Sequence, residues 1–139
     1  MANPTQQTEY KFGAIRELQE LHTNVGFTIG AEATNAITVA IQLKDGKTGV
    51  DCNERRSVLA YLSDDANGDA IVATAPDGGW AIGTDGLLIP IVASKAALLV
   101  SESDGDIDVT ITHAAGAKTV YLIVVAGGLL HASGAITFA

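Results

Sequence analysis

The stretch Asp106–Ala126, DIDVTITHAAGAKTVYLIVVA, decides the fold. Residues 106–112 alternate Asp or Thr with Ile or Val, and this period of two is typical of a strand with one buried face. Residues 119–126 are apolar at nearly every position, which predicts a strand in the centre of a sheet. A helix would need apolar residues three and four positions apart. The stretch therefore predicts β structure.

Further strands are predicted on both sides of this stretch by the same alternation or by short apolar runs. They lie at residues 37–43, 57–63, 70–75, 80–83, 87–93 and 97–102, and a last segment covers residues 129–138. Asp-Gly or Asn-Gly pairs, which favour tight turns, occur at 45–46, 67–68, 77–78, 85–86 and 104–105. Pro90 cannot donate a backbone hydrogen bond, so we expect residues 87–93 to form an edge strand.

This succession of short strands and turns predicts an all-β fold, an antiparallel β-sandwich. Each short amphipathic strand must bury one face, and a second sheet packed against the first provides that cover. A helical bundle would need long segments of period 3.6, and none follows residue 22. A closed barrel is the alternative.

The N-terminal part has a different character. Residues 1–11 contain almost no large apolar side chain and predict an extended arm. In the following segment, FGAIRELQELH, the residues Ile15, Leu18 and Leu21 are spaced for one face of a short helix. A strand followed by a loop is the alternative for this segment.

Residues 23–35 are rich in Gly, Thr, Asn and Ala and predict a linker with one short strand at Gly26–Ile29. We therefore expect two regions in the chain. Residues 1–35 form an N-terminal arm and linker, and residues 36–139 form the β-sandwich domain.

The composition excludes some classes of function. The chain has 139 residues, enough for one domain, and a net charge of −8, which argues against nucleic-acid binding because phosphate contacts need clustered Lys and Arg. Hydrophobic residues make up 47% and charged residues 17%, so the chain can bury a core. The polar N-terminus lacks the basic flank and apolar run of a secretory signal, and no apolar run is long enough to span a membrane, so we expect synthesis in the cytoplasm and no membrane partner.

No residue pattern points to a reaction or a cofactor. Cys52 is the single cysteine, and its acidic sequence neighbours disfavour a reactive thiolate. The three histidines lack the spacing of a zinc site, and no nucleophile motif occurs. We therefore expect no enzyme and assign no catalytic, cofactor-binding or metal-binding residues.

Two features have alternative interpretations. Asp65, Asn67 and Asp69 have the alternate spacing of a calcium loop, but the sixth and twelfth positions of that loop lack the required Gly and Glu. A weak calcium site made of turn oxygens is the alternative. Trp80, with Tyr61 and Tyr121, could form a sugar-stacking platform, although single aromatics among aliphatic residues more often pack against a core.

Several segments carry a resemblance to a protein family. They are Ile37–Asp45 (ITVAIQLKD), Val58–Asp64 (VLAYLSD), Gly79–Gly86 (GWAIGTDG), Leu99–Thr112 (LVSESDGDIDVTIT) and Ser133–Ala139 (SGAITFA). Together they resemble small structural proteins of tailed bacteriophages, over about residues 36–139. The resemblance implies a virion structural protein with an immunoglobulin-like sandwich, and within that class a capsid decoration, or cement, protein.

We therefore expect a non-enzymatic protein on the capsid surface that bridges neighbouring subunits of the major capsid protein. A homotrimer would match the quasi-threefold positions of a capsid. The expected partner-binding residues are the apolar side chains of the N-terminal region: Tyr10, Phe12, Ile15, Leu18 and Leu21. The alternatives are a tail, neck or head-fibre component that binds a host surface, and a β-sandwich enzyme or sugar-binding domain outside any virion.

Overall fold

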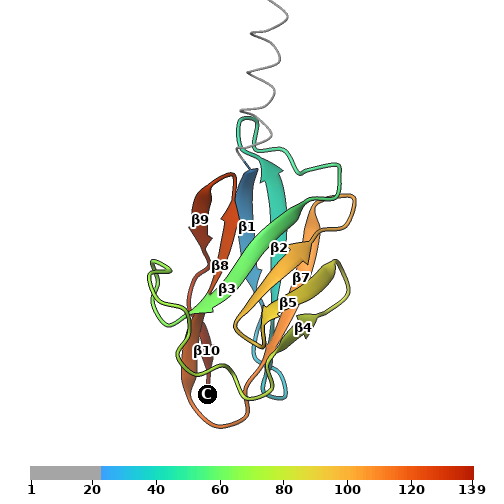
Figure 1. The fold of residues 1–139 in the computed structure, drawn as a ribbon. Helices are drawn as coiled ribbons and strands as arrows, with labels where there is room; N and C mark the ends of the chain where they lie inside the picture. Colours follow the sequence, from blue (N-terminus) through green and yellow to red (C-terminus); the bar gives the residue numbers. More distant parts are fainter. Residues whose placement is uncertain (1–22) are drawn as a thin grey trace, which may run out of the picture.

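A computed structural model describes residues 23–139, which form ten strands in two antiparallel sheets (Figure 1). The four-stranded sheet contains, in spatial order, β1 (Thr23–Ile29), β2 (Ala36–Asp45), β7 (Asp106–Thr112) and β4 (Trp80–Ile82). The six-stranded sheet contains, in spatial order, β10 (Ile136–Phe138), β8 (Lys118–Ala126), β3 (Ser57–Ser63), β6 (Ala96–Val100) and β5 (Leu87–Val92), with β9 (Leu129–Ala132) also paired to β8. No helix occurs within residues 23–139. The predicted antiparallel β-sandwich is therefore confirmed.

The core lies between the two sheets and follows the predicted alternation. Every second residue of β2 and β7 is buried, and the facing residues come mainly from β3, β6 and β8. The largest fully buried side chains include Leu43, Leu62, Leu99, Ile111, Leu122 and Phe138. Because the period is two, the same strands direct their remaining residues away from the core.

The order of the strands confirms two predictions. β8 lies inside the six-stranded sheet, with β3 along one side and β9 and β10 along the other. β5 lies at the edge of that sheet, as Pro90 predicted, and its pairing with β6 is irregular between Pro90 and Val92. The last predicted segment, 129–138, contains two strands, β9 and β10.

The strand predicted at residues 70–75 is wrong. That segment belongs to the loop between β3 and β4, where a single bridge joins Ser63 to Ile71. Two backbone hydrogen bonds join the segment to the end of β3, from the Val72 N–H to the Leu62 carbonyl oxygen at 2.8 Å and from the Asp64 N–H to the Ala70 carbonyl oxygen at 3.3 Å, and side chains make the next contacts. Ser63 Oγ donates to the Ala70 carbonyl oxygen at 2.7 Å, and Asp64 Oδ2 accepts the Ala73 N–H at 2.8 Å.

The sheet begins at Thr23, before the predicted domain boundary at residue 36. β1 contains the predicted short strand at Gly26–Ile29 but is longer, and it pairs with β2 along its whole length. Its alternate residues Val25, Phe27 and Ile29 pack against the core. A tight turn at Thr34 and Asn35, both with positive φ, connects β1 to β2.

The connectivity is immunoglobulin-like in part. The neighbours β1–β2–β7 and β10–β8–β3 have the same spatial order as strands A-B-E and G-F-C of immunoglobulin domains. The strands β4, β5 and β6 are connected in a different sequence order from the corresponding strands of a variable domain. The immunoglobulin-like assignment therefore stays a prediction.

Candidate interaction surface

The outer side of the six-stranded sheet carries a row of apolar residues across five strands. Strand register places them side by side, because Leu98 pairs with both Ile89 and Leu59, and Val125 pairs with both Leu59 and Leu130. Their sequence neighbours in β3, β6 and β8 face the core, so these residues face away from it. We call Ile89, Leu98, Leu59, Val125 and Leu130 the outer apolar row.

The outer apolar row is accessible. Leu59 is 40% exposed, Ile89 44% and Leu130 52%, while Leu98 and Val125 are half-buried. Contiguous apolar patches on a protein surface often mark contact sites, so the outer apolar row is a candidate contact surface.

Part of the same side of the sheet is already covered by the loop between β3 and β4. Tyr61 Oη donates to the Gly68 carbonyl oxygen at 2.6 Å, and Ile123 lies fully buried beneath this loop. Asp65 Oδ1 holds the loop in place by accepting the backbone N–H groups of Asn67 and Gly68 at 2.7 and 2.9 Å. The outer apolar row and β5 lie outside the area that this loop covers.

Strand β5 extends the apolar surface to the edge of the sheet. Leu87, Ile91 and Val92 are 51%, 60% and 46% exposed. An edge strand with such side chains would invite pairing with another strand, but Pro90 and the irregular register interrupt it. The surface is therefore suited to side-chain packing and poorly suited to strand addition.

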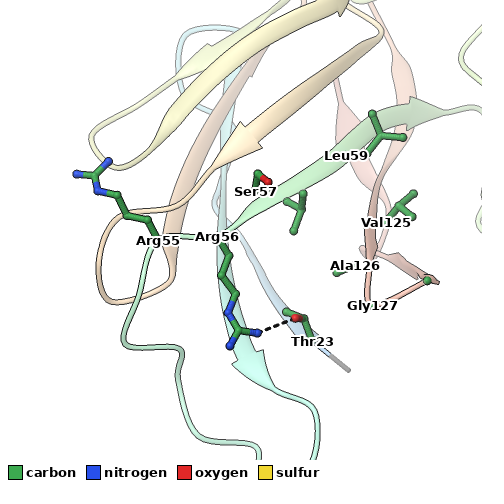
Figure 2. A pocket seen from close by; sticks show the side chains of 10 residues that line it. Thr23, Arg55, Arg56, Ser57, Leu59, Val125, Ala126 and Gly127 are labelled. Atoms are coloured by element: carbon green, nitrogen blue, oxygen red, sulfur yellow. Dashed lines mark hydrogen bonds between the residues drawn. The ribbon is translucent and has the colours of Figure 1, made fainter. Parts of the chain in front are cut away.

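An open groove of about 480 Å³ continues the outer apolar row at one end of the sandwich (Figure 2). We call it the end groove. Its lining residues come from the start of β1, the start of β3 and the turn between β8 and β9: Thr23, Arg55, Arg56, Ser57, Val58, Leu59, Val125, Ala126, Gly127 and Gly128. Leu59 and Val125 belong to both the groove and the row, so the two form one continuous surface.

Two arginines line the end groove, and each is paired with a glutamate. Arg56 donates through Nη1 to Thr23 Oγ1 at 2.9 Å, and its Nη2 lies 2.9 Å from Glu54 Oε1 (Figure 2 shows the contact with Thr23). Arg55 Nη2 pairs with Glu102 Oε2 at 2.6 Å. Arg56 is thereby fixed against the first described residue of the chain.

A smaller hollow of about 320 Å³ lies on the four-stranded sheet beside Gln42, Lys44 and Asp106. Partial burial, together with the negative charges of Asp104 and Asp85, raises the pKa of Asp106. This hollow contains the Asp106 carboxyl, whose charged form is disfavoured there, and it lacks a row of apolar side chains. It is therefore the weaker candidate for a contact surface.

The predicted partner-binding residues, Tyr10, Phe12, Ile15, Leu18 and Leu21, lie outside the described residues, as do the predicted arm and short helix. None of the predicted partner-binding residues belongs to the outer apolar row. Its signal was present in LLIPIV at residues 87–92 and in the doubly apolar pattern of β8, which was interpreted only as a central strand.

The other candidate residues, Cys52, His113 and Trp80, take part in packing or in hydrogen bonds within the fold. Cys52 is buried, and burial raises the pKa of its thiol. His113 lies at the rim of the core, where its Nδ1 accepts the Asp77 N–H at 3.2 Å and its ring meets Phe138 edge-on. Trp80 lies in the other sheet from Tyr61, so the structure does not bring them together as a platform.

The aspartates Asp65 and Asp77 stabilise turns by accepting hydrogen bonds from backbone N–H groups. Asp65 accepts backbone N–H groups, and a backbone N–H from Ala114 lowers the pKa of Asp77. Within the described part of the chain, no group of three or more His, Cys, Asp or Glu side chains is arranged to hold a metal ion. In residues 23–139 there is also no helix with the length and apolarity needed to cross a membrane.

No family model matches the chain, and no curated protein matches its sequence.

Proposed function

We propose that this protein is a non-enzymatic structural protein of a tailed-phage virion, which decorates the capsid and bridges neighbouring subunits of the major capsid protein. The observation that carries the proposal is the outer apolar row, an uncovered aliphatic surface on a β-sandwich. The sequence resemblance to small structural proteins of tailed phages supplies the kind of partner.

The physical requirements of decoration agree with this structure. A decoration protein must keep its shape on a lattice, and two sheets packed over a shared aliphatic core provide a rigid body. It must also present a surface with few charges, because the centres of stable interfaces are depleted of charged residues. The outer apolar row meets that condition with five aliphatic side chains.

The proposal includes the finer expectations of a homotrimer and an immunoglobulin-like sandwich. A trimer on a quasi-threefold position would contact the capsid three times, and repeated weak contacts give stable occupancy without a strong single site. In this proposal the apolar side chains Tyr10, Phe12, Ile15, Leu18 and Leu21 add contacts to the major capsid protein.

The test is a binding experiment with capsids that lack this protein. Purified protein is added, bound copies per particle are counted by quantitative mass spectrometry, and reconstruction of the particles locates them. We expect hundreds of copies over the whole head, and a chain lacking residues 1–22 should bind far fewer.

Matched variants isolate the outer apolar row. Leu130→Asp and Leu59→Asp place a charge on the row and should reduce bound copies at least tenfold, whereas Ala81→Asp, on the exposed side of β4, should not. Thermal unfolding of each variant shows whether it remains folded. Absence from purified virions, or copies at a single vertex only, would contradict decoration, and the second result would favour a tail, neck or head-fibre role.

A further inference from the structure

Strand β1 lies at the edge of the four-stranded sheet, with β2 on one side and no strand of residues 23–139 paired on the other (Figure 1). With seven residues it is the longest edge strand of the described chain, and its register with β2 is unbroken. It contains no proline and no charged residue. The next longest edge strand, β5, is interrupted beside Pro90. An edge that keeps a regular series of free backbone groups can accept a further strand.

The backbone groups of β1 point alternately toward β2 and toward the open edge. Gly30 continues the register of the strand and donates its N–H to the Thr38 carbonyl oxygen at 2.8 Å. Every second residue before Gly30 therefore bonds to β2, and the residues between them direct N–H and C=O to the open edge: Val25, Phe27 and Ile29. Within residues 23–139, no hydrogen bond reaches these edge groups. The three residues are half-buried, so their backbone groups gain from a partner.

We propose that β1 pairs with β1 of a second copy of this chain, antiparallel and about a two-fold axis at Gly26. The two four-stranded sheets then form one continuous sheet of eight strands. This contact goes beyond the proposed function, because the outer apolar row lies on the six-stranded sheet and stays free. It is compatible with a trimer that forms through other surfaces.

In this arrangement the edge of β1 is complementary to itself. With the axis at Gly26, Val25 lies opposite Phe27, and Thr23 lies opposite Ile29. Each of these two pairs occurs twice, and each exchanges two backbone hydrogen bonds, which gives about eight in all. A typical interface between proteins has about ten direct hydrogen bonds. The backbone of β1 alone therefore supplies nearly a full set.

The side chains of β1 also suit a second copy. Val25 opposite Phe27 brings a β-branched residue to an aromatic one, which is a favourable pair across strands. On the exposed side, Asn24 lies opposite Thr28, and both are uncharged and form hydrogen bonds. Gly26 places no side chain at the axis, so the backbones can approach closely. Because the whole chain carries a net charge of −8, an uncharged edge is where two copies meet with little repulsion.

Disulfide trapping in the full chain tests this register. All variants are made in a Cys52→Ala background, so that the engineered cysteine is the single thiol. A Cβ at Gly26 makes only ordinary contacts, the nearest being Lys44 Cε at 3.5 Å, so Gly26→Cys fits the folded strand. Across the axis the two Cα atoms lie about 4.5 Å apart, within the range of about 4.4–6.8 Å that a disulfide spans. We expect Gly26→Cys to form an interchain disulfide readily on mild oxidation.

Thr28→Cys is the matched control, because Thr28 shares the exposed side of β1 with Gly26 but lies opposite Asn24 of the second copy. Alone, this variant should form an interchain disulfide several times more slowly than Gly26→Cys. Mixed with Asn24→Cys chains, it should form a mixed disulfide dimer. No disulfide with Gly26→Cys, or equal rates for Gly26→Cys and Thr28→Cys alone, would overturn the inference.

Sedimentation equilibrium measures the contact without cysteines. We expect the native chain to associate in pairs, and Gly26→Asp, which places like charges opposite each other at the axis, should raise the dissociation constant at least tenfold. Ala81→Asp, on the exposed side of β4, is the control and should leave it unchanged. Leu130→Asp, which tests the proposed function, should also leave it unchanged, so failure of the two proposals is distinguishable. A native chain that does not associate, or a dissociation constant that Gly26→Asp leaves unchanged, would contradict pairing through β1.

Discussion

At the scale of single residues, the acidic side chains show that a spacing typical of metal binding can instead belong to residues that stabilise a turn. The spacing of Asp65, Asn67 and Asp69 resembles a calcium loop, but the Asp65 carboxylate is occupied by backbone N–H groups of its own loop. The spacing of these residues in the sequence indicates that their side-chain oxygens lie close together in a turn. It does not indicate which group the oxygens bind, because that depends on the three-dimensional path of the loop.

Removing this carboxylate should loosen the loop over Ile123. We expect Asp65→Ala to lower the free energy of unfolding by about 1–2 kcal/mol, because backbone donors lose their acceptor. Urea denaturation measures the change. Asp69→Ala, in the same exposed loop, is the control and should change stability by less than about 0.5 kcal/mol.

Asp106 should respond to pH in a predictable direction. Burial and neighbouring acids raise its pKa in the folded protein, so its charge opposes folding above that pKa, and the penalty disappears as the pH falls through it. Asp106→Asn should therefore raise the melting temperature modestly at pH 7. The gain should vanish near pH 3, where the native carboxyl is protonated. A stabilisation that is equal at both pH values would contradict this explanation.

At the scale of elements, alternation predicted most strands well, because it reports which face a strand buries. Its failures have local causes. Residues 70–75 look like a strand, but they pair with the end of β3 at a single bridge, and the Ser63 and Asp64 side chains make further hydrogen bonds to the segment. The prediction for β1 was too short because Thr and Gly dilute its pattern. The outer apolar row was missed because it exists only through register between strands that are distant in sequence.

Two glycines with similar backbone conformations allow a controlled test of how β4 and β5 are joined. Gly86 (φ +102°) enters β5, and a Cβ there would lie 2.9 Å from the Val100 carbonyl oxygen, whereas Gly116 (φ +106°) has nothing within 4 Å. We expect Gly86→Ala to destabilise the fold by about 2–4 kcal/mol and Gly116→Ala by about 1 kcal/mol. Thermal denaturation compares the two, and equal losses would show that the close approach to β6 is unimportant.

At the scale of the whole molecule, composition and turn spacing were sufficient to predict two packed antiparallel sheets. These sequence features placed the start of the sandwich at residue 36, whereas β1 is already paired with β2 at Thr23, the first described residue. We therefore expect a chain of residues 23–139 to unfold cooperatively. A chain of residues 36–139 should lose cooperativity, because it lacks the β1 side chains that pack on the core. Circular dichroism during heating distinguishes them, and a cooperative transition in the shorter chain would contradict the expectation.

Pro90 affects how copies of this protein can associate when the protein is concentrated. At high concentration a bare, aliphatic sheet edge is a template for fibrous growth. Pro90 withholds one amide and the displaced pairing beside it bends the margin, so an incoming chain finds no regular ladder to extend. The interruption in β5 thus disfavours edge-to-edge association through this strand between copies of this chain.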